Sequence, residues 1–303
     1  DMNFLKQSQF ELSDIELSLL QLSADLSPAR SAAGHIVLLN KNDRSPSSLI
    51  IDEATIKLGN VNDSPWFLEA GKRYIPFGTF YTHFAEDPLT MNIYQTRETT
   101  LMGGYSSDKI RLLAGVFNGE LDEELMDPED KIDDFFISFR WQPSSYFCFD
   151  AAWLSDAGEA DFIEQSLFFE TIGYRRANGF ASSIFLSHGP FTLYSEIITS
   201  EKLKILGEII PINTPVTNDT RYIRIFQPMA WNIELGCQIS EKWHAAVKAD
   251  GSDEVQNTPE YRYGGGVSYF VEKNIVIKTE YLAAEFKDLP DAHSVNIQLG
   301  IML

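Results

Sequence analysis

The sequence has few cysteines, no long apolar run and no clustered metal ligands. Its 303 residues include two cysteines and five histidines. No apolar stretch approaches the roughly 20 residues that a membrane-spanning helix needs. The histidines are dispersed, with neither metal-ligand spacing nor a CxxC partner. The sequence therefore argues against a helical membrane protein, and it predicts neither a metal site nor a cofactor.

Basic residues are also scarce. There are 24 Lys and Arg against 44 Asp and Glu, which gives a formal net charge of −20. Nucleic-acid binding needs a basic footprint, so we expect no nucleic-acid partner. A membrane partner is compatible with this charge, because the charged residues of an outer-membrane barrel lie in its loops and lumen.

Catalytic motifs are missing as well. The segment "GYSSD" (104–108) lacks the GxSxG pattern of a nucleophile elbow. "GGG" (264–266) lies inside an expected strand, where glycine makes room in the wall or lets a neighbour pack closely. No nucleophile, base and oxyanion set converges, so we expect no enzymatic activity and no catalytic residues. The opening "DMNFLKQ" lacks the regions of a secretory signal, which was removed, was trimmed or never existed.

The sequence is rich in strict alternation of apolar and polar residues. It ends "SVNIQLGIML" (294–303), and the same period of two recurs in "NIVIKTEYLAAEF" (274–286) and "EYRYGGGVSYF" (260–270). This period marks a strand with one apolar and one different face. In a soluble sandwich the apolar face packs on a second sheet, whereas in an outer-membrane barrel it contacts lipid.

The connections between the alternating segments favour the barrel, because short and long ones take turns. The short ones are "VNDS", "SSD", "QPSS", "SHGP", "SEK" and "VEKN". The long ones are "NKNDRSPSS", Thr79–Tyr94, "NGELDEELMDPEDKID", Ser155–Asn178, Ser200–Thr220 and "GSDEVQNTPE". A barrel has short periplasmic turns and long outer loops in this rhythm. A soluble sandwich has no reason to sort its loops in this way.

Aromatic residues give a second regularity. An aromatic side chain on the apolar phase lies beside most short connections: Trp66, Tyr105, Trp141, Phe147, Phe191, Trp243 and Tyr269. Such rings form a girdle at the lipid headgroups. The same strand phases place Cys148 on the polar face and Cys237 on the apolar face, so we expect no disulfide.

Together these patterns predict an all-β fold. We expect a single domain over 1–303: a transmembrane antiparallel β-barrel of about 16 strands in the outer membrane of a Gram-negative bacterium, with no separate plug domain and with both termini on the periplasmic side. The expected strands are 3–12, 14–26, 32–40, 48–59, 65–77, 95–106, 108–118, 132–142, 145–155, 178–187, 190–199, 221–239, 241–250, 260–270, 274–286 and 292–303.

Part of the chain resembles the legiobactin-receptor family of siderophore porins. The resemblance lies in the "DEA" strand, the "AGKRYIPFGTF" strand, the "EDPLT" loop and the "RET" strand within 49–99, and in "LMGGYSSDKIRLLAGVFNGE" (101–120). It is weaker at "FDAAWLSD" (149–156) and "MAWNIELG" (229–236). The resemblance implies a 16-stranded outer-membrane barrel for uptake of ferric siderophores, without the plug of energised receptors.

The polar strand phase supplies the candidate lumen and substrate-pathway residues. They are Lys57, Arg73, Arg111, Arg140, Lys248, Arg262 and Lys278, with Glu53, Glu69, Glu98, Glu196, Glu234 and Glu280. Charges in a lumen set the selectivity of a pore. The alternative is structural, with cross-strand Arg–carboxylate pairs that hold the wall rigid. The face of Arg97 stays open: its phase points outward near the upper rim, where its side chain can snorkel.

Two long connections are unusual. "ELDEELMDPEDKIDD" (120–134) is dense in acidic residues but lacks EF-hand spacing, so a solvated outer loop is favoured over a cation site. "LKILGEIIPI" (203–212) is apolar and is a candidate constriction in the lumen or part of a ligand or partner surface.

Three functions fit the sequence. The first, from the resemblance, is a porin for ferric siderophores or similar small iron chelates. The second is a general or substrate-selective diffusion porin. The third is a surface interaction protein that the barrel only anchors. The expected partners are outer-membrane lipid and a small-molecule solute, and the oligomeric state stays open.

Overall fold

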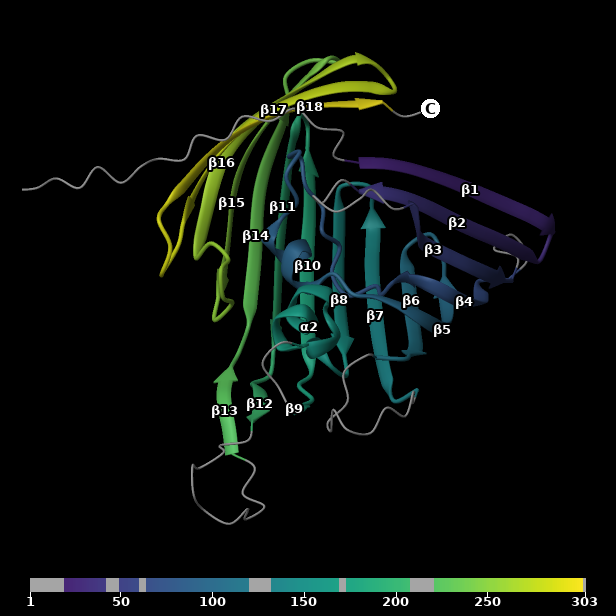
Figure 1. The fold of residues 1–303 in the computed structure, drawn as a ribbon. Coiled ribbons are helices and arrows are strands. Elements are labelled where there is room, and N and C mark those ends of the chain that lie inside the picture. The colour runs from purple at the N-terminus through teal and green to yellow at the C-terminus, as the bar shows by residue number, and fades with distance from the viewer. Residues whose placement is uncertain are drawn as a thin grey trace, which may run out of the picture.

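Most of the chain lies in one antiparallel sheet. The computed structural model describes residues 19–41, 49–59, 64–119, 132–168, 173–207 and 221–301. Within them, fifteen strands pair in chain order. They are β1 (Leu19–Ala29), β2 (Ala32–Lys41), β3 (Leu49–Leu58), β4 (Trp66–Tyr74), β5 (Arg97–Ser106), β6 (Ile110–Phe117), β7 (Asp134–Ser144), β8 (Phe147–Leu154), β10 (Gly179–His188), β11 (Phe191–Ser200), β14 (Met229–Gln238), β15 (Trp243–Asp253), β16 (Tyr261–Glu272), β17 (Ile275–Glu285) and β18 (Ala292–Ile301). The strands stand side by side in a curled wall from purple β1 to yellow β18 (Figure 1).

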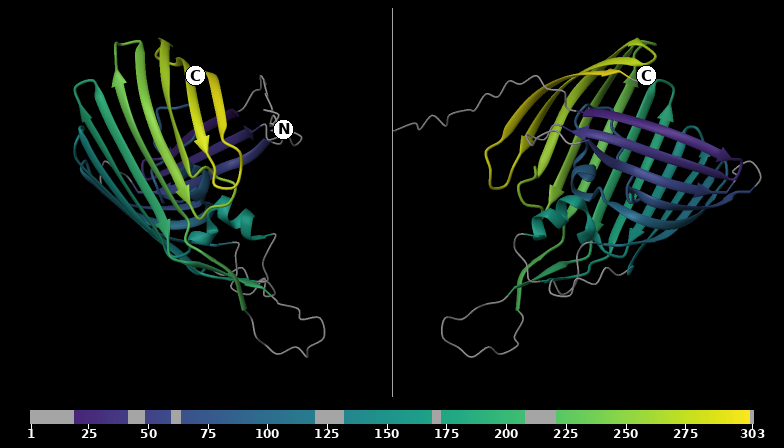
Figure 2. Two further views of the ribbon diagram at one scale, coloured as in Figure 1. Left: turned by 90° about the vertical axis from the view of Figure 1, so that its left-hand side faces the viewer. Right: turned by 45° about the vertical axis from the view of Figure 1, so that its right-hand side comes forward.

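The expected alternation of connections is confirmed. β5 and β6 are joined by 107–109, β7 and β8 by 145–146, and β16 and β17 by 273–274, whereas 75–96 and 155–178 are long. Short and long connections lie at opposite ends of the wall, as barrel topology requires (Figures 1 and 2).

This parity also bears on how the two end strands of the wall can be joined. β18 runs from the long-loop end to the short-turn end, and so does β1, so the two strands are parallel to each other. Within the described residues they do not pair. An antiparallel closure needs one more strand between them, which gives the even number typical of such barrels. The strand expected at 3–12 lies outside the described residues.

The outer face of the wall is apolar. On β18 the side chains of Val295, Ile297, Leu299 and Ile301 are each more than 60% exposed. Aromatic pairs lie at the short-turn end of this face, such as Trp66 with Tyr105, Trp141 with Phe147, and Trp243 with Tyr269. Exposing such an apolar surface to water would be unfavourable, whereas contact with lipid is what a transmembrane barrel requires of its outer face.

A proline separates two strands where the sequence predicted one. The span expected at 221–239 is β13 (Arg221–Phe226) followed by β14, and Pro228 lies between them. Proline has no N–H to donate, so it interrupts a central ladder. β13 pairs with β12 (Leu203–Gly207), which also pairs with β9 (Gly173–Arg175). This small sheet extends beyond the long-loop end (Figure 1).

Helices are short. They are α1 (Leu89–Tyr94), α2 (Asp161–Phe168) and the 3-10 turn Ala157–Glu159. No helix among the described residues is long and apolar enough to cross a membrane. Cys148 and Cys237 are both free thiols.

The interior is less polar than strand phase suggested. Four apolar side chains of β4 to β7, Phe67, Met102, Leu113 and Phe136, are at most 5% exposed. They belong to one cluster with Ile75, Phe77, Ile93 and Tyr94 from the 75–96 connection and Ile163 from α2. An apolar core inside the wall therefore holds the 75–96 connection in place.

Candidate functional site

The connection between β4 and β5, residues 75–96, folds into the interior; we call it the inward loop. The Thr79–Tyr94 stretch was expected among the long outer connections, and it does join β4 to β5 at the long-loop end, but its course turns inward. The ends of the inward loop are joined by a hydrogen bond from the Ile75 amide to the Thr96 carbonyl of 2.9 Å. At its far side the Tyr94 hydroxyl donates to the Pro228 carbonyl at 2.5 Å. The loop thus crosses from its own strands to the opposite wall.

Two glutamates on the opposite wall bind the first half of the loop. Glu196 on β11 accepts hydrogen bonds from the Thr79 amide and the Thr90 hydroxyl, each at 2.7 Å. Glu234 on β14 accepts from the Thr82 hydroxyl and the His83 amide, each also at 2.7 Å. Both carboxylates are at most 2% exposed. Hydrogen bonds to buried carboxylates are strong, so these contacts fix the course of the loop.

Two further carboxylates bind the second half. Glu280 on β17 accepts from the Ala85 amide at 2.6 Å and the Glu86 amide at 3.0 Å. Asp250 on β15 accepts from the Leu89 amide at 3.1 Å. A carboxylate from each of β11, β14, β15 and β17 therefore satisfies backbone donors of the loop, which local secondary structure leaves unpaired.

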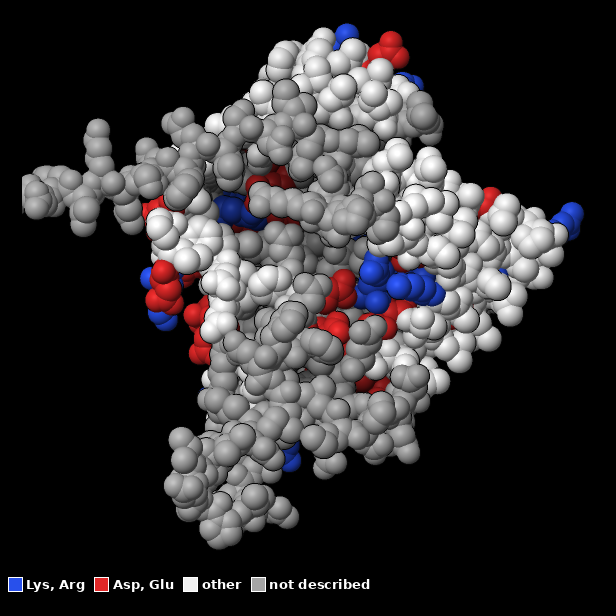
Figure 3. Space-filling view, in the orientation of Figure 1, with Lys and Arg blue, Asp and Glu red and all other residues white. Residues whose placement is uncertain are grey.

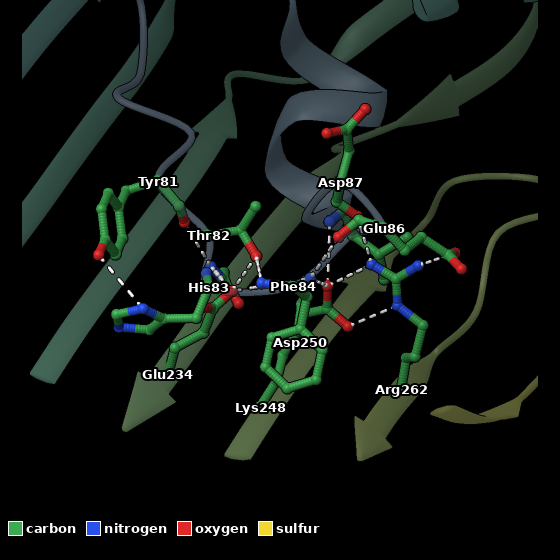
Figure 4. A network of polar contacts seen from close by, with 12 residues as sticks. Tyr81, Thr82, His83, Phe84, Glu86, Asp87, Glu234, Lys248, Asp250 and Arg262 are labelled. Atoms are coloured by element: carbon green, nitrogen blue, oxygen red, sulfur yellow. Dashed lines mark hydrogen bonds and ion pairs between the residues drawn. The ribbon is translucent and has the colours of Figure 1, made fainter. Parts of the chain in front are cut away.

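Basic side chains of the same wall bind the carbonyls of the loop. Lys278 donates to the Phe84 carbonyl at 2.8 Å and Lys248 to the Glu86 carbonyl at 3.3 Å. Arg262 donates to the Asp87 carbonyl at 2.7 Å and to Asp250 at 2.6 and 2.9 Å, and it forms an ion pair with Glu86. Figure 4 shows these groups converging on residues 81–87 from neighbouring strands.

Six candidate lumen residues are thus brought together: Lys248, Arg262, Lys278, Glu196, Glu234 and Glu280. Their contacts correspond to the structural alternative considered above, although the partner is a loop rather than only the neighbouring strand. Lys248 also lies 3.7 Å from Glu234 and 3.4 Å from Asp250, so the charges compensate each other. Charges paired this closely offer little field to a passing solute.

The candidates on β3 to β5 lie on the other side of the interior. Glu69 and Arg73 form an ion pair, and the Lys57 ammonium lies 3.9 Å from the centre of the Phe67 ring. Glu98 is the cross-strand partner of Arg73. Glu53 is half-buried on β3. Basic and acidic side chains meet in the hollow of the molecule in Figure 3.

Arg97 is the first residue of β5, at the long-loop end of the wall, and its side chain is paired rather than extended into lipid. Its guanidinium donates to Asp52 at 2.7 Å, and Tyr74 donates to the same carboxylate at 2.9 Å. Asp52 is 5% exposed and lies at a bulge of β3, between the pairs of Glu53 with Val37 and of Ile51 with Leu38.

Arg111 and Arg140 form the remaining part of the site. They are directly opposite each other on β6 and β7. Arg140 donates to Asp150 on β8 at 2.6 Å, whereas Arg111 makes no hydrogen bond or ion pair with another described residue. Both line a small cavity of about 70 Å³ together with Pro76, Gly78 and Thr79 of the inward loop.

Sequence reasoning missed several residues of the site. Asp250 lies on the polar phase of its strand, so strand phase was a usable signal for it. Thr79 and Glu86 carried no signal, because nothing in the local pattern shows which wall residues a long loop contacts. The candidate constriction at 203–212 is described only at Leu203–Gly207, and these residues form β12 in the small outer sheet. Residues 120–131 of the acidic connection lie outside the described residues.

Solved structures identify the architecture. The chain resembles OmpF of Salmonella typhi with a TM-score of 0.63 and 13% identity, covering 92% of this chain and 89% of that one. This is the fold of an outer-membrane porin. The outer membrane channel DcaP of Acinetobacter baumannii matches with a TM-score of 0.60 and 14% identity, over 93% of this chain and 83% of that one. An anion-selective porin from Comamonas acidovorans matches with a TM-score of 0.60 and 8% identity, over 93% and 83%. The chain is a transmembrane barrel of the Gram-negative outer membrane.

Sequence comparison gives a short match. No family model matches the chain. UPF0422 proteins of Legionella pneumophila, from strains Lens, Philadelphia 1 and Paris, are 31% identical over 61 residues. The match spans 20% of this chain and only 12% of the length of those relatives.

Proposed function

We propose that this chain is a passive outer-membrane channel for small anionic solutes, and that ferric siderophores of the carboxylate type, or similar iron chelates, are among them. The observation that carries the proposal is the position of Arg111. Its guanidinium faces the pocket beside the inward loop and has no carboxylate partner among the described residues. The channel needs no catalytic step, in keeping with the channels and porins named among its structural relatives.

The electrostatics of Arg111 support an anionic solute. Burial and the charges of Arg73 and Arg140 disfavour its charged form, and Glu69 and Asp150 offset this effect only in part; Arg140 is its direct cross-strand neighbour. Like charges at opposite positions destabilise a sheet, so a purely structural wall would place a carboxylate here. A passing anion provides the missing partner through charge-assisted hydrogen bonds in a poorly screened space.

The choice of iron chelates rests on the resemblance to siderophore porins. Arg73 lies in the "AGKRYIPFG" segment that carries it. Carboxylate siderophores with bound iron are anionic, so they fit the same arginines.

Reversal potential in a planar bilayer under a salt gradient tests the channel. Replacing Arg73, Arg111 and Arg140 by Gln is expected to shift selectivity toward cations and to reduce uptake of an anionic iron chelate by expressing cells. Arg97→Gln is the matched control, because that guanidinium is already paired with Asp52. We expect it to have a smaller effect on both measurements.

The outcomes separate the two parts of the proposal. If a folded triple variant keeps the ion selectivity of the wild type, the three arginines have a structural role and do not select the solute. A shift in selectivity with unchanged iron-chelate uptake would leave a general anion channel and refute the choice of siderophore.

A further inference from the structure

A second cavity lies at the long-loop end of the interior, beside β16 to β18; we call it the outer cavity. Its volume is about 570 Å³, which is in the range of small-molecule sites. It is lined by residues of the inward loop, of α2, of the connection between β15 and β16, and of the long-loop ends of β16, β17 and β18. Arg111 and Arg140 line the small cavity and not this one, so the two cavities are separate.

The charged side chains that line the outer cavity are paired. Arg262 forms an ion pair with Glu86, as Figure 4 shows. The other carboxylate oxygen of Glu86 accepts a hydrogen bond from the Asn296 side chain at 3.1 Å. The Nδ1 atom of His293, at the start of β18, lies 2.9 Å from the Tyr281 hydroxyl. A charged ligand would have to compete with these contacts, whereas an uncharged ligand leaves them in place.

Apolar side chains form much of the remaining surface of the outer cavity. Leu89 of the inward loop and Leu282 of β17 are at most 3% exposed in the protein, and Phe162 of α2 lies against the same cavity. Packing a ring or a short chain on this surface removes apolar area from water. Neutral polar side chains also reach the cavity and can bond to hydroxyl groups of a ligand: Asn92, Asn257, Thr258 and Ser294.

Hydrogen bonds fix the segments around the outer cavity. The Asp161 amide at the start of α2 donates to the Gln95 carbonyl at 3.0 Å, which joins α2 to the inward loop. In the connection between β15 and β16, the Ser252 hydroxyl lies 2.7 Å from the Thr258 hydroxyl and donates to the Pro259 carbonyl at 2.7 Å. The cavity is therefore formed before a ligand arrives, so binding requires little ordering of the protein.

We propose that the outer cavity binds small uncharged molecules that combine an aromatic ring or a short apolar chain with hydroxyl groups. The apolar part packs among Leu89, Phe162 and Leu282, and the hydroxyl groups bond to neutral side chains such as Asn257 and Ser294. The long-loop end is the outer end of such a barrel, so these molecules enter from outside the cell. The site does not depend on the proposed anion channel.

Isothermal titration calorimetry of the detergent-solubilised full chain with 4-nitrophenyl glucoside tests this site. The probe has an aromatic ring and neutral hydroxyl groups. Methyl glucoside lacks the ring, and 4-nitrophenyl phosphate carries a charged group in place of the sugar. We expect the wild type to bind 4-nitrophenyl glucoside more tightly than either of the other two compounds. Titration into empty micelles gives the heat of partition into detergent, which is subtracted.

Two variants change the outer cavity in opposite ways. Ser294→Phe adds a ring inside it, and Phe162→Ala removes one. The contact of one aromatic side chain corresponds to about a fivefold change in affinity, so we expect 4-nitrophenyl glucoside to bind about fivefold more weakly to each variant. Gln298→Phe is the matched control, because it adds the same ring on the same face of β18 at a position that does not line the cavity.

The outcomes are distinct. Equal affinity of the wild type, Ser294→Phe and Phe162→Ala for 4-nitrophenyl glucoside would overturn the proposal, and so would a wild type that does not bind it. Tighter binding of 4-nitrophenyl phosphate that is lost in Ser294→Phe would show that the cavity takes anions and would refute the uncharged class. None of these titrations measures ion selectivity, so failure of this site leaves the proposed channel to its own test.

Discussion

Removing the Glu196 carboxylate should release the inward loop. Glu196 is 2% exposed and binds the Thr79 amide, the Thr79 hydroxyl and the Thr90 hydroxyl at 2.7, 3.1 and 2.7 Å. In Glu196→Ala the Thr79 hydroxyl keeps Ser183 and Tyr194 as partners, but the Thr79 amide and the Thr90 hydroxyl lose theirs. An unsatisfied buried donor costs about 1–3 kcal/mol, so two cost roughly 4 kcal/mol. That corresponds to about a thousandfold increase in the opening equilibrium of the loop.

Hydrogen–deuterium exchange of residues 79–90 and single-channel conductance measure this release. We expect faster exchange in Glu196→Ala and a larger or noisier conductance, because the loop occupies the interior. Glu196→Gln retains an oxygen acceptor and should change both less. Glu53→Gln, on β3 away from the loop, is the control for loss of a wall charge. Wild-type exchange and conductance in Glu196→Ala would refute the role of the carboxylate as a loop anchor.

Two further predictions concern pH and glycine. Burial lowers the pKa of His83 in the folded protein to about 4, below its ordinary value of 6.5, so the folded state binds fewer protons than the unfolded state, and stability is lost as the pH falls from about 6.5 to 4. In thermal unfolding in detergent, the loss of stability between pH 6.5 and 4 should be smaller for His83→Gln than for the wild type. The groups that face position 83 remain in this variant: Glu234, Lys278, His244 and Tyr81. Equal losses of stability would contradict the assignment of this pH dependence to His83. A Cβ at Gly264 would lie 1.9 Å from the Tyr281 carbonyl oxygen, whereas the nearest atom to one at Gly265 is at 3.6 Å. Gly264→Ala should therefore refold in far lower yield than Gly265→Ala, and similar yields would show that the β16–β17 pairing adjusts.

Much of the wall could be predicted from the sequence because the face that each strand residue takes depends on its position within its own strand. Alternation of period two reports which side of a strand faces lipid, as on β18, where Val295 and Ile297 face outward and Asn296 bonds inward to Glu86 and Glu280. Strand phase could not show that Arg97 is paired, because its partner Asp52 lies at a bulge of β3, where the alternation is interrupted.

The candidate site was harder to predict. Strand phase correctly turns Glu196, Glu234 and Glu280 inward, but whether they face water or a loop depends on the path of residues 75–96. That path follows from contacts between positions more than a hundred residues apart, and the apolar residues Ile75, Phe77 and Ile93 gave no local sign of it. The phase therefore identified charged residues without revealing which of them were already paired.

The position of the inward loop has a consequence for assembly. The loop is synthesised between β4 and β5, yet the side chains that bind residues 79–90 are on β10 and later strands, from Ser183 to Asn296, at sequence separations of 104 to 210 residues. Contacts between such distant positions form late in folding, since the entropy of loop closure must be overcome first. The narrow passage is therefore completed only after the last strands have joined the wall. A chain that stops folding before that step would have an incomplete sheet and no fixed loop in its interior. The structure that limits permeability would therefore form last.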